Sequence, residues 1–243
     1  MTVVTFDLWN TLVELSPSEA RSYVLRRHAL GRAWLAGNAG GRLPPGLARV
    51  PVVVRREADR WEHRGKVMTI PEQARRMARL ARRPRSPGPY REALRALVRS
   101  LPVRPREGAL ELLADLSSQG RRLGLISNLT LEPPEAVREL VERLRLGHYL
   151  EVLVFSSEVG CSKPDPRPFA RALRALGGTP NEAVHVGDSY SSDVAGALAA
   201  GWRGAVLLLD PRRSPGPGGD ARVERVHRLS EVPDALRRLL PPG

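Results

Sequence analysis

The sequence predicts an α/β fold, a Rossmann-like doubly wound parallel sheet that carries an inserted α-helical cap. Short apolar, β-branched runs recur along the chain and alternate with helical patterns, which is typical of parallel strands buried on both faces. The alternation stops between residues 15 and 103, where helical patterns dominate and only Val52–Val54 has the composition of a strand. We therefore predict a core built from residues 1–14 and 104–243 and a helical cap at 15–103.

Five runs have the composition of buried strands, and helical patterns lie between them. The strand runs are Val3–Phe6, Leu123–Ile126, Val152–Phe155, Ala183–Val186 and Ala205–Leu209. The helical patterns are Arg106–Ser118, Pro134–Leu144, Pro166–Leu176 and Asp193–Ala200, with a final helix expected after Ser230 as its N-cap. Such alternation implies right-handed crossovers, which bring the carboxyl ends of the strands to one edge of the sheet, where ligands bind.

Two capping boxes mark helix starts in the predicted cap. Ser16–Glu19 and Thr69–Glu72 each place Ser or Thr three residues before Glu, with proline at the first or second helical position. Stretches rich in Gly, Pro or Arg predict loops at Gly37–Pro51, Arg83–Pro89 and Pro211–Asp220. The cap is therefore expected to consist of helices joined by loops.

The positive charge of the chain is concentrated in the predicted cap. The chain has 37 arginines, two lysines and a formal net charge of +13. Residues 15–100 contribute a net +14, so the remainder is close to neutral. A basic module attracts anionic ligands, although an arginine-rich composition is also expected from a GC-rich genome. Aromatic residues, on which single-stranded nucleic acids stack, are sparse in this region, so we expect no nucleic-acid partner.

The sequence predicts a cytoplasmic protein with no membrane partner. Its first residues carry no basic segment of the kind that opens a secretory signal, and no apolar run approaches the roughly 18 to 20 residues of a membrane span. Cys161 is the only cysteine. This excludes an intrachain disulfide and a metal site built from several cysteines.

Polar residues follow the first two predicted strands at the edge where ligands bind. Asp7 ends the first run, and a carboxylate in this position can act as a nucleophile and form a covalent intermediate. It is followed by Asn10, a residue type that tolerates a left-handed turn, and by Thr11. Ser127 and Asn128 end the second run. The Ser127 hydroxyl could donate to a phosphoryl oxygen or only cap a turn.

Two later segments supply a cation and two acids. Lys163, in the segment Gly160–Pro166, is the only lysine outside the predicted cap, and its compact ammonium could hold a carboxylate and a transferring group together. Asp188 and Asp193 follow the run Ala183–Val186 and stand five residues apart. Hard oxygen ligands at a strand end suit Mg²⁺, although either acid could instead cap a helix.

These four motifs, in this order, resemble those of the haloacid dehalogenase-like (HAD) hydrolases that carry a helical cap between the first and second motifs. The resemblance extends over nearly the whole chain and implies a small phosphorylated substrate and a Mg²⁺ cofactor. The implied catalytic residues are Asp7 as nucleophile with Ser127 and Lys163 as stabilisers, and the implied substrate-binding residues are Thr11 and Asn128. The implied metal ligands are Asp7, the backbone carbonyl of Trp9, Asp188 and Asp193.

Trp9 is where the sequence departs from the family pattern. Phosphatases of this family carry DxDGT, and here the second aspartate is replaced by Trp9. That aspartate protonates the leaving oxygen and later activates water, and general acid–base help of this kind is worth about 10² to 10⁴-fold. An indole cannot supply it, whereas the backbone carbonyl at this position is unchanged. The substitution therefore concerns the supply of a proton.

Three interpretations of the motif set are open at the level of sequence. We favour a Mg²⁺-dependent phosphatase that forms an aspartyl-phosphate on Asp7 and acts on acyl or aryl phosphates, or that takes a proton donor from the cap. The candidate donors are Tyr23, His28, Glu62 and His63. The second interpretation is a 2-haloacid dehalogenase-like hydrolase with an ester intermediate on Asp7, because that branch carries an aromatic residue at the position of Trp9 and a halide leaves without a proton. The third is a catalytically degenerate binding protein.

Overall fold

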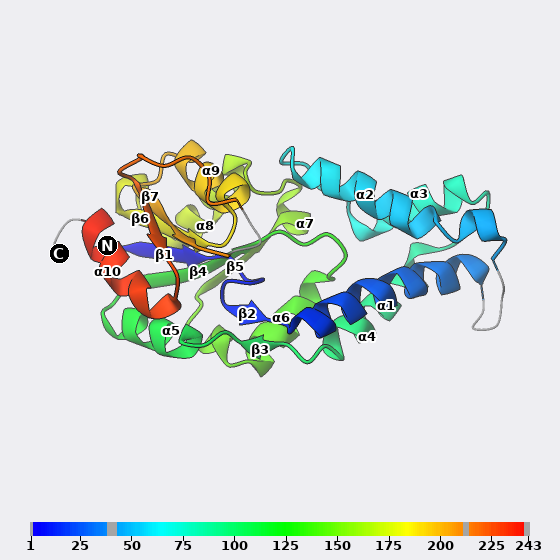
Figure 1. Cartoon of the computed structure of the whole chain (residues 1–243), viewed down its shortest axis with the longest axis horizontal. Coiled ribbons are helices and arrows are strands. Elements are labelled where there is room, and N and C mark those ends of the chain that lie inside the picture. The colour runs from blue at the N-terminus through cyan, green and yellow to red at the C-terminus, as the bar shows by residue number, and fades with distance from the viewer. Residues whose placement is uncertain (1, 38–42, 211–213, 241–243) are drawn as a thin grey trace.

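The computed structural model describes residues 2–37, 43–210 and 214–240, and it confirms the predicted α/β fold. A six-stranded parallel sheet has the strand order β5-β4-β1-β6-β7-β8 (Figure 1). The strands are β1 (Val3–Phe6), β4 (Arg122–Ser127), β5 (Val152–Phe155), β6 (Ala183–Gly187), β7 (Gly204–Leu208) and β8 (Val223–Val226). Because β1 lies between β4 and β6, Asp7 leaves the middle of the sheet at its carboxyl edge.

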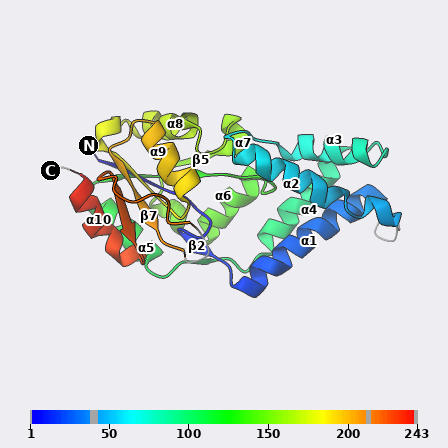
Figure 2. The same ribbon diagram turned by 45° about the horizontal axis from the view of Figure 1, so that its top comes forward.

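Helices cover both faces of the sheet and form two apolar cores with it (Figure 2). One face carries α5 (Ala109–Ser118), α6 (Pro134–Arg143) and α10 (Val232–Leu239). The other carries α8 (Pro166–Leu176) and α9 (Ala195–Ala199). Val3 and Val4 enter opposite cores, because successive side chains of a strand point to opposite faces. Burial on both faces explains why the strands are continuously apolar.

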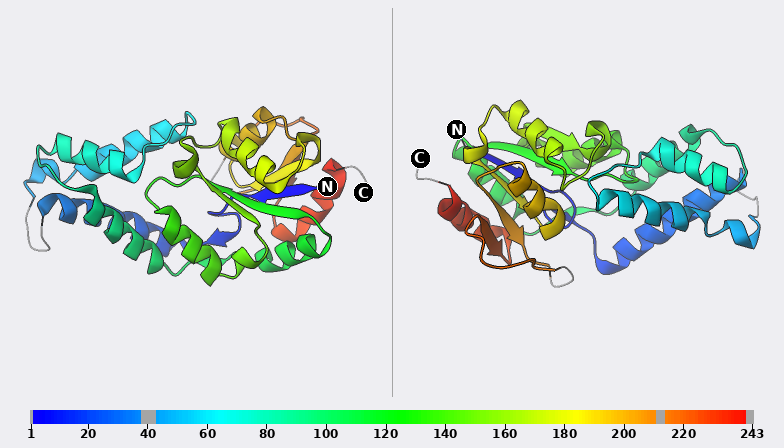
Figure 3. Two further views of the ribbon diagram at one scale, coloured as in Figure 1. Left: turned by 180° about the vertical axis from the view of Figure 1, so that it is seen from behind. Right: turned by 90° about the horizontal axis from the view of Figure 1, so that it is seen from above.

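Of the five α-helices that the structure describes between β1 and β4, four project from one end of the core (Figure 3). They are α1 (Pro17–Ala36), α2 (Val50–Glu62), α3 (Ile70–Leu80) and α4 (Pro87–Arg99), and they share an apolar cluster that includes Leu35, Val54 and Met77. The chain leaves and re-enters the core through β2 (Val13–Glu14) and β3 (Arg104–Pro105), which pair antiparallel. The division into a core at 1–14 and 104–243 and a cap at 15–103 remains our proposal.

Both predicted capping boxes are present at the starts of cap helices. The backbone N–H of Glu19 donates to Ser16 Oγ at 3.3 Å, and the Ser16 N–H donates to the Glu19 carboxylate at 2.6 Å. Thr69 and Glu72 form the corresponding pair at α3. Even α1, which has 20 residues, is not apolar enough to cross a membrane, and neither is any other helix in the described ranges.

The strand predicted at Val52–Val54 is wrong, because these residues belong to α2. Val50, Val54 and Ala58 are buried at a spacing of four, which places them on one helical face. The helical period of the whole segment therefore prevails over the strand propensity of three consecutive valines.

Several predicted loop and helix boundaries also move. The loop at Gly37–Pro51 contains a 3₁₀ turn at Pro45–Leu47 and ends where α2 begins, while residues 38–42 lie outside the described ranges. Ser230 is not an N-cap, because it lies within a 3₁₀ turn and α10 starts at Val232. Residues 211–213 of the loop at Pro211–Asp220 also lie outside the described ranges. Helix α4 starts inside the predicted loop Arg83–Pro89, and α5 starts at Ala109 instead of Arg106. Strand β8 and the short helix α7 (Ser156–Val159) are among the elements that the sequence analysis does not predict.

Candidate active site

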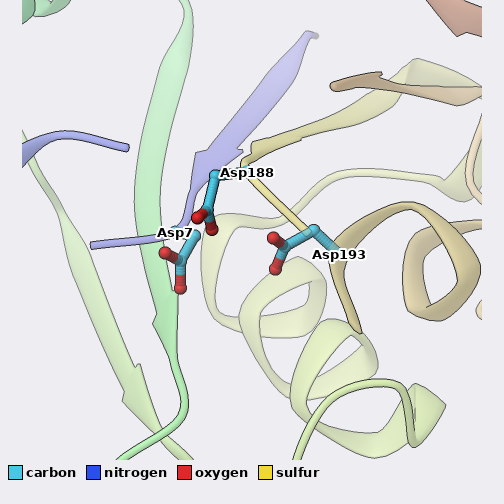
Figure 4. Close-up of side chains that lie close together, drawn as sticks. All are labelled: Asp7, Asp188 and Asp193. Carbon is cyan, nitrogen blue, oxygen red and sulfur yellow. The ribbon is translucent and has the colours of Figure 1, made fainter. Parts of the chain in front are cut away.

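Three buried aspartates meet at the carboxyl edge of the sheet (Figure 4). Asp7 follows β1 and Asp188 follows the neighbouring strand β6, while Asp193 lies in a π-helical turn, Tyr190–Val194, that leads into α9. One ligand oxygen of each carboxylate lies within 4.8 Å of the others. The carboxyl ends of neighbouring parallel strands lie side by side. Asp7 and Asp188 are therefore close in space although they are more than 180 residues apart in the chain.

Lys163 holds two of these carboxylates from within the protein. Its side chain is 2% exposed, and Nζ lies 2.7 Å from Asp7 Oδ1 and 2.7 Å from Asp193 Oδ1. Nζ also donates to the carbonyl of Ile126 at 2.6 Å. An ammonium has three N–H donors, so these contacts use its full capacity and fix the position of the charge. Lys163 thus contacts Asp7 and also Asp193, while its predicted contact with a transferring group stays a prediction.

The pKa values of this network follow from burial and from the shared cation. Burial raises the pKa of Asp7 to about 6, against the opposing charge of Lys163. Burial also acts to raise the pKa of Asp193, but the charge of Lys163 and the contact with His185 hold it below its usual range. Although burial lowers the pKa of Lys163, the charges of Asp193 and Asp7 raise it overall. Asp193 is thus the stronger ion-pair partner of the ammonium.

The backbone around Asp193 is shaped for its close approach. The N–H of Ser189 donates to Asp193 Oδ2 at 2.9 Å, and the Asp193 N–H donates to the Ser189 carbonyl at 2.8 Å. A Cβ atom at Gly187 would lie 2.3 Å from the carboxylate carbon of Asp193, so only glycine permits this arrangement. Single π-helical turns occur frequently at functional sites.

His185 supports Asp193 from inside β6 and was not assigned from the sequence. Its Nδ1 lies 2.8 Å from Thr5 Oγ1, and its Nε2 lies 3.4 Å from Asp193 Oδ1. Burial lowers the pKa of His185 to about 4, so the ring is neutral at neutral pH. These contacts assign the proton to Nε2, facing the carboxylate, and leave Nδ1 to accept from the Thr5 hydroxyl. A histidine in an otherwise apolar strand run was the available signal.

The residues after β1 form the tight turn that the sequence predicts. Asn10 has φ of 62°, and the left-handed backbone there lets Thr11 turn back towards Asp7. The Thr11 hydroxyl lies 3.5 Å from Asp7 Oδ2, the outer limit of a hydrogen bond. At the end of β4, Ser127 Oγ is buried and has no hydrogen-bond partner among the described residues. A buried hydroxyl without a partner costs stability. A group of this kind is often one that hydrogen-bonds to a ligand.

Asn128 is joined to Lys163 by two hydrogen bonds. Its Oδ1 accepts from the Lys163 backbone N–H at 2.9 Å, and its Nδ2 donates to the Lys163 carbonyl at 3.1 Å. The amide therefore fixes the backbone from which the Lys163 side chain extends. Its predicted contact with substrate stays a prediction, and positioning Lys163 is a second task that the sequence did not indicate.

A cavity of about 130 Å³ opens onto this network. Its wall consists of Asp7, Trp9, Glu62, Asn128, Lys163, Asp188, Ser189, Ser192 and Asp193. Trp9 is half-buried, and its side chain packs against the core that contains Phe6, so this residue stands on the wall beside the predicted nucleophile. The volume is far below the 300 to 1,000 Å³ of ordinary ligand pockets. It suits a group of the size of a phosphoryl.

Of the four candidate proton donors in the cap, the structure places only Glu62 on the wall of this cavity. The Tyr23 hydroxyl donates instead to Glu132 at 2.5 Å. His63 contacts the Asp59 carbonyl at the exposed end of α2, and His28 is absent from the wall residues. The sequence alone could not separate these four, because the separation depends on how the cap packs on the core.

Comparisons with known proteins find a matching family and related phosphatases. The sequence model of haloacid dehalogenase-like hydrolases matches residues 1–201. A glyceraldehyde 3-phosphate phosphatase of Methanothermobacter thermautotrophicus is 41% identical over 107 residues, covering 44% of this chain and 45% of that protein. A phosphoserine phosphatase of Thermus thermophilus is 38% identical over 122 residues, covering 48% and 47%.

A solved structure resembles the chain over almost its full length. It is a 2-haloacid dehalogenase from Pseudomonas syringae pv. Tomato, with a TM-score of 0.70 and 27% sequence identity, covering 98% of this chain and 99% of that one. By contrast, the chain spans about half the length of the curated relatives it matches. The structural likeness therefore includes the helices of residues 15–103 as well as the sheet.

Proposed function

Because the chain belongs to the haloacid dehalogenase-like hydrolase family, we propose that it is a Mg²⁺-dependent phosphatase in which Asp7 forms an aspartyl-phosphate. The observation that carries the proposal is the buried network in which Lys163 contacts both Asp7 and Asp193 at 2.7 Å. Such a network costs desolvation energy. The network lies at the carboxyl edge of the sheet, on the wall of a cavity. A costly group of buried charges in such a place indicates a catalytic role.

The donor set fits Mg²⁺. Three carboxylates converge, and hard oxygen ligands are those that Mg²⁺ prefers. Both oxygens of Asp193 already accept hydrogen bonds, from Lys163 and from the Ser189 backbone. We therefore propose Asp7, Asp188 and the backbone carbonyl of Trp9 as the principal ligands, with Asp193 completing the set. A bound Mg²⁺ supplies charge stabilisation to the phosphoryl oxygens.

The side chains then divide the reaction between them. A carboxylate oxygen of Asp7 attacks phosphorus and the bond to the leaving oxygen breaks, after which water attacks the same phosphorus and releases phosphate. Lys163 holds Asp7 in position and neutralises charge that develops on the phosphoryl group. Ser127 Oγ, which is buried without a partner among the described residues, donates to a phosphoryl oxygen. Trp9 supplies no proton, so the favoured substrates are acyl and aryl phosphates, whose leaving groups need little protonation, unless a residue of the cap donates the proton.

Metal-dependent release of phosphate tests the proposal. With MgCl₂, the purified protein is expected to hydrolyse acetyl phosphate and p-nitrophenyl phosphate, and chelation with EDTA should reduce the rate to background. Readdition of MgCl₂ should restore it, because the carboxylates remain in place without the ion. Absence of turnover on both substrates would overturn the proposal.

Replacing Trp9 by aspartate should restore the missing acid. We expect Trp9→Asp to increase hydrolysis of alkyl phosphates, which have poor leaving groups, by about 10-fold or more within the 10² to 10⁴-fold range of general acid–base catalysis. Hydrolysis of p-nitrophenyl phosphate should change much less, since its leaving group needs little protonation. The ratio of the two rates, measured on one preparation, is the readout. An unchanged ratio would show that Trp9 does not limit proton supply.

A dehalogenase activity is the second candidate. It is favoured by the likeness to a 2-haloacid dehalogenase over the whole chain and by an aromatic residue at position 9, since a halide leaves without a proton. Release of chloride from 2-chloropropionate in the presence of EDTA would support it, with Asp7 attacking carbon instead of phosphorus. The converging carboxylates favour the phosphatase, because displacement of a halide needs no metal site.

A further inference from the structure

Glu62 is the one residue of the cap on the wall of the cavity, as far as the chain is described. It is the last residue of α2, and the other wall residues all come from segments at the carboxyl edge of the sheet. A substrate whose phosphoryl group contacts Asp7 has its leaving group directed away from that edge, because the nucleophile and the leaving group lie on opposite sides of phosphorus. The cap side of the cavity, where Glu62 stands, is therefore the side of the leaving oxygen.

The carboxyl group of Glu62 is held by residues of the core. The Thr130 hydroxyl donates to Oε2 at 2.6 Å, and Asn128 Nδ2 donates to Oε1 at 3.3 Å. Neither donor is charged, so the carboxyl group forms no ion pair with either of them. Asn128 also binds the backbone of Lys163. Asn128 thus connects Glu62 to Lys163, the lysine that contacts Asp7.

A neighbouring contact fixes the end of α2 over the site. The Ser162 N–H donates to the Gly65 carbonyl at 3.0 Å, and the Ser162 hydroxyl donates to the Lys66 carbonyl at 3.2 Å. Gly65 has φ of 71°, a left-handed turn that lets the chain fold back beside Ser162. The segment that precedes Lys163 and the turn that follows Glu62 are therefore fastened together.

We propose that Glu62 is the proton donor for the leaving oxygen and does the work of the aspartate that Trp9 replaces; this inference rests on the proposed phosphatase function. As Asp7 bonds to phosphorus and the phosphorus–oxygen bond of the substrate breaks, the Glu62 carboxyl gives its proton to the leaving oxygen. The resulting carboxylate then accepts a proton from the water that attacks the phosphoryl group on Asp7. Phosphate leaves, and both Asp7 and Glu62 return to their starting forms.

The dependence of rate on the leaving group tests this assignment. The probes are p-nitrophenyl, p-chlorophenyl and phenyl phosphate, which have similar shapes but leaving groups of decreasing quality. Glu62→Gln keeps an oxygen that can accept from Thr130 and removes the transferable proton. We expect it to reduce kcat/KM about 10²-fold on phenyl phosphate and less than about 10-fold on p-nitrophenyl phosphate. Glu62→Asp should recover part of the lost rate on phenyl phosphate.

Glu57→Gln is the matched control. Glu57 lies on the same helix and pairs with Arg76 at 3.1 Å, away from the cavity wall, so this variant should leave the leaving-group dependence unchanged. If Glu62→Gln lowers kcat/KM equally on all three probes, or not at all, the assignment of Glu62 is overturned. The proposed phosphatase function still stands in that case, provided that the wild type hydrolyses the probes. Failure of the wild type to hydrolyse any probe would overturn both. Melting temperatures of all variants identify a loss caused by unfolding.

Discussion

Phosphate release should fall by about 10³-fold or more when Asp7 is replaced by asparagine. The amide has nearly the same shape as the carboxylate but is a far weaker nucleophile, so no aspartyl-phosphate can form on it. Asp7 is part of the buried network, and its Oδ1 lies 2.7 Å from Lys163 Nζ. The measurement is release of phosphate from acetyl phosphate by wild type and Asp7→Asn at saturating MgCl₂.

The same substitution should leave the fold nearly intact. Burial raises the pKa of Asp7 to about 6, above the value of an unfolded chain. The wild type therefore loses stability as the pH rises from about 4 to 6, and a permanently neutral amide avoids this loss. At pH 7 we expect the melting temperature of Asp7→Asn to lie within about 4 °C of the wild type. The exposed Asp115→Asn on α5 serves as a control, and full activity in Asp7→Asn would refute the nucleophile assignment.

Lys163→Met should damage both stability and activity. It would leave the buried carboxylates of Asp7 and Asp193 without their shared cation, and removing one partner of a buried ion pair costs about 3 to 5 kcal/mol. For a chain of this size we expect the melting temperature to fall by roughly 10 °C. Turnover by the remaining folded protein should fall by about 10²-fold or more, because charge stabilisation of the transferring group is lost.

Lys66→Met is the control that the composition offers, since Lys66 is the other lysine and is exposed in the cap. We expect Lys66→Met to change the free energy of unfolding by no more than about 0.5 kcal/mol, as is usual for a surface substitution. Its melting temperature should therefore stay close to that of the wild type. Adding Asp7→Asn to Lys163→Met should recover part of the lost stability, because one unpaired carboxylate is removed. A melting temperature in Lys163→Met equal to that of the wild type would show that the lysine contributes no net stabilisation.

The sequence predicts the sheet well because its strands are buried on both faces, which makes them apolar without interruption. β8 escapes prediction since its sequence, VERV, places two charged residues between two valines at the edge of the sheet. The three valines at Val52–Val54 mislead in the opposite direction, because β-branched residues also pack in a helix when one face is buried. Local composition therefore predicts the centre of the fold better than its periphery.

Part of the candidate site could be predicted from the sequence, and part of it could not. Asp7, Asp188 and Asp193 could be predicted to converge, because parallel strand ends share an edge. The contacts of Glu62 with Thr130 and Asn128 join residues 66 to 68 positions apart, and no periodicity or motif encodes them. They depend on the angle at which α2 meets the sheet. The support of Asp193 by His185 is likewise a matter of packing across β1 and β6.

The antiparallel pair of β2 and β3 has only two residues in each strand. So short a ribbon does little to fix the angle between the core and the cap. That angle is set by other contacts between the two. Those contacts are both polar and apolar: Gln73 donates to the Thr130 carbonyl, Arg99 pairs with Glu139, and Leu131 packs into the apolar cluster of the cap. A movement of the cap about this ribbon that widens the 130 Å³ cavity therefore has to break part of this set of contacts.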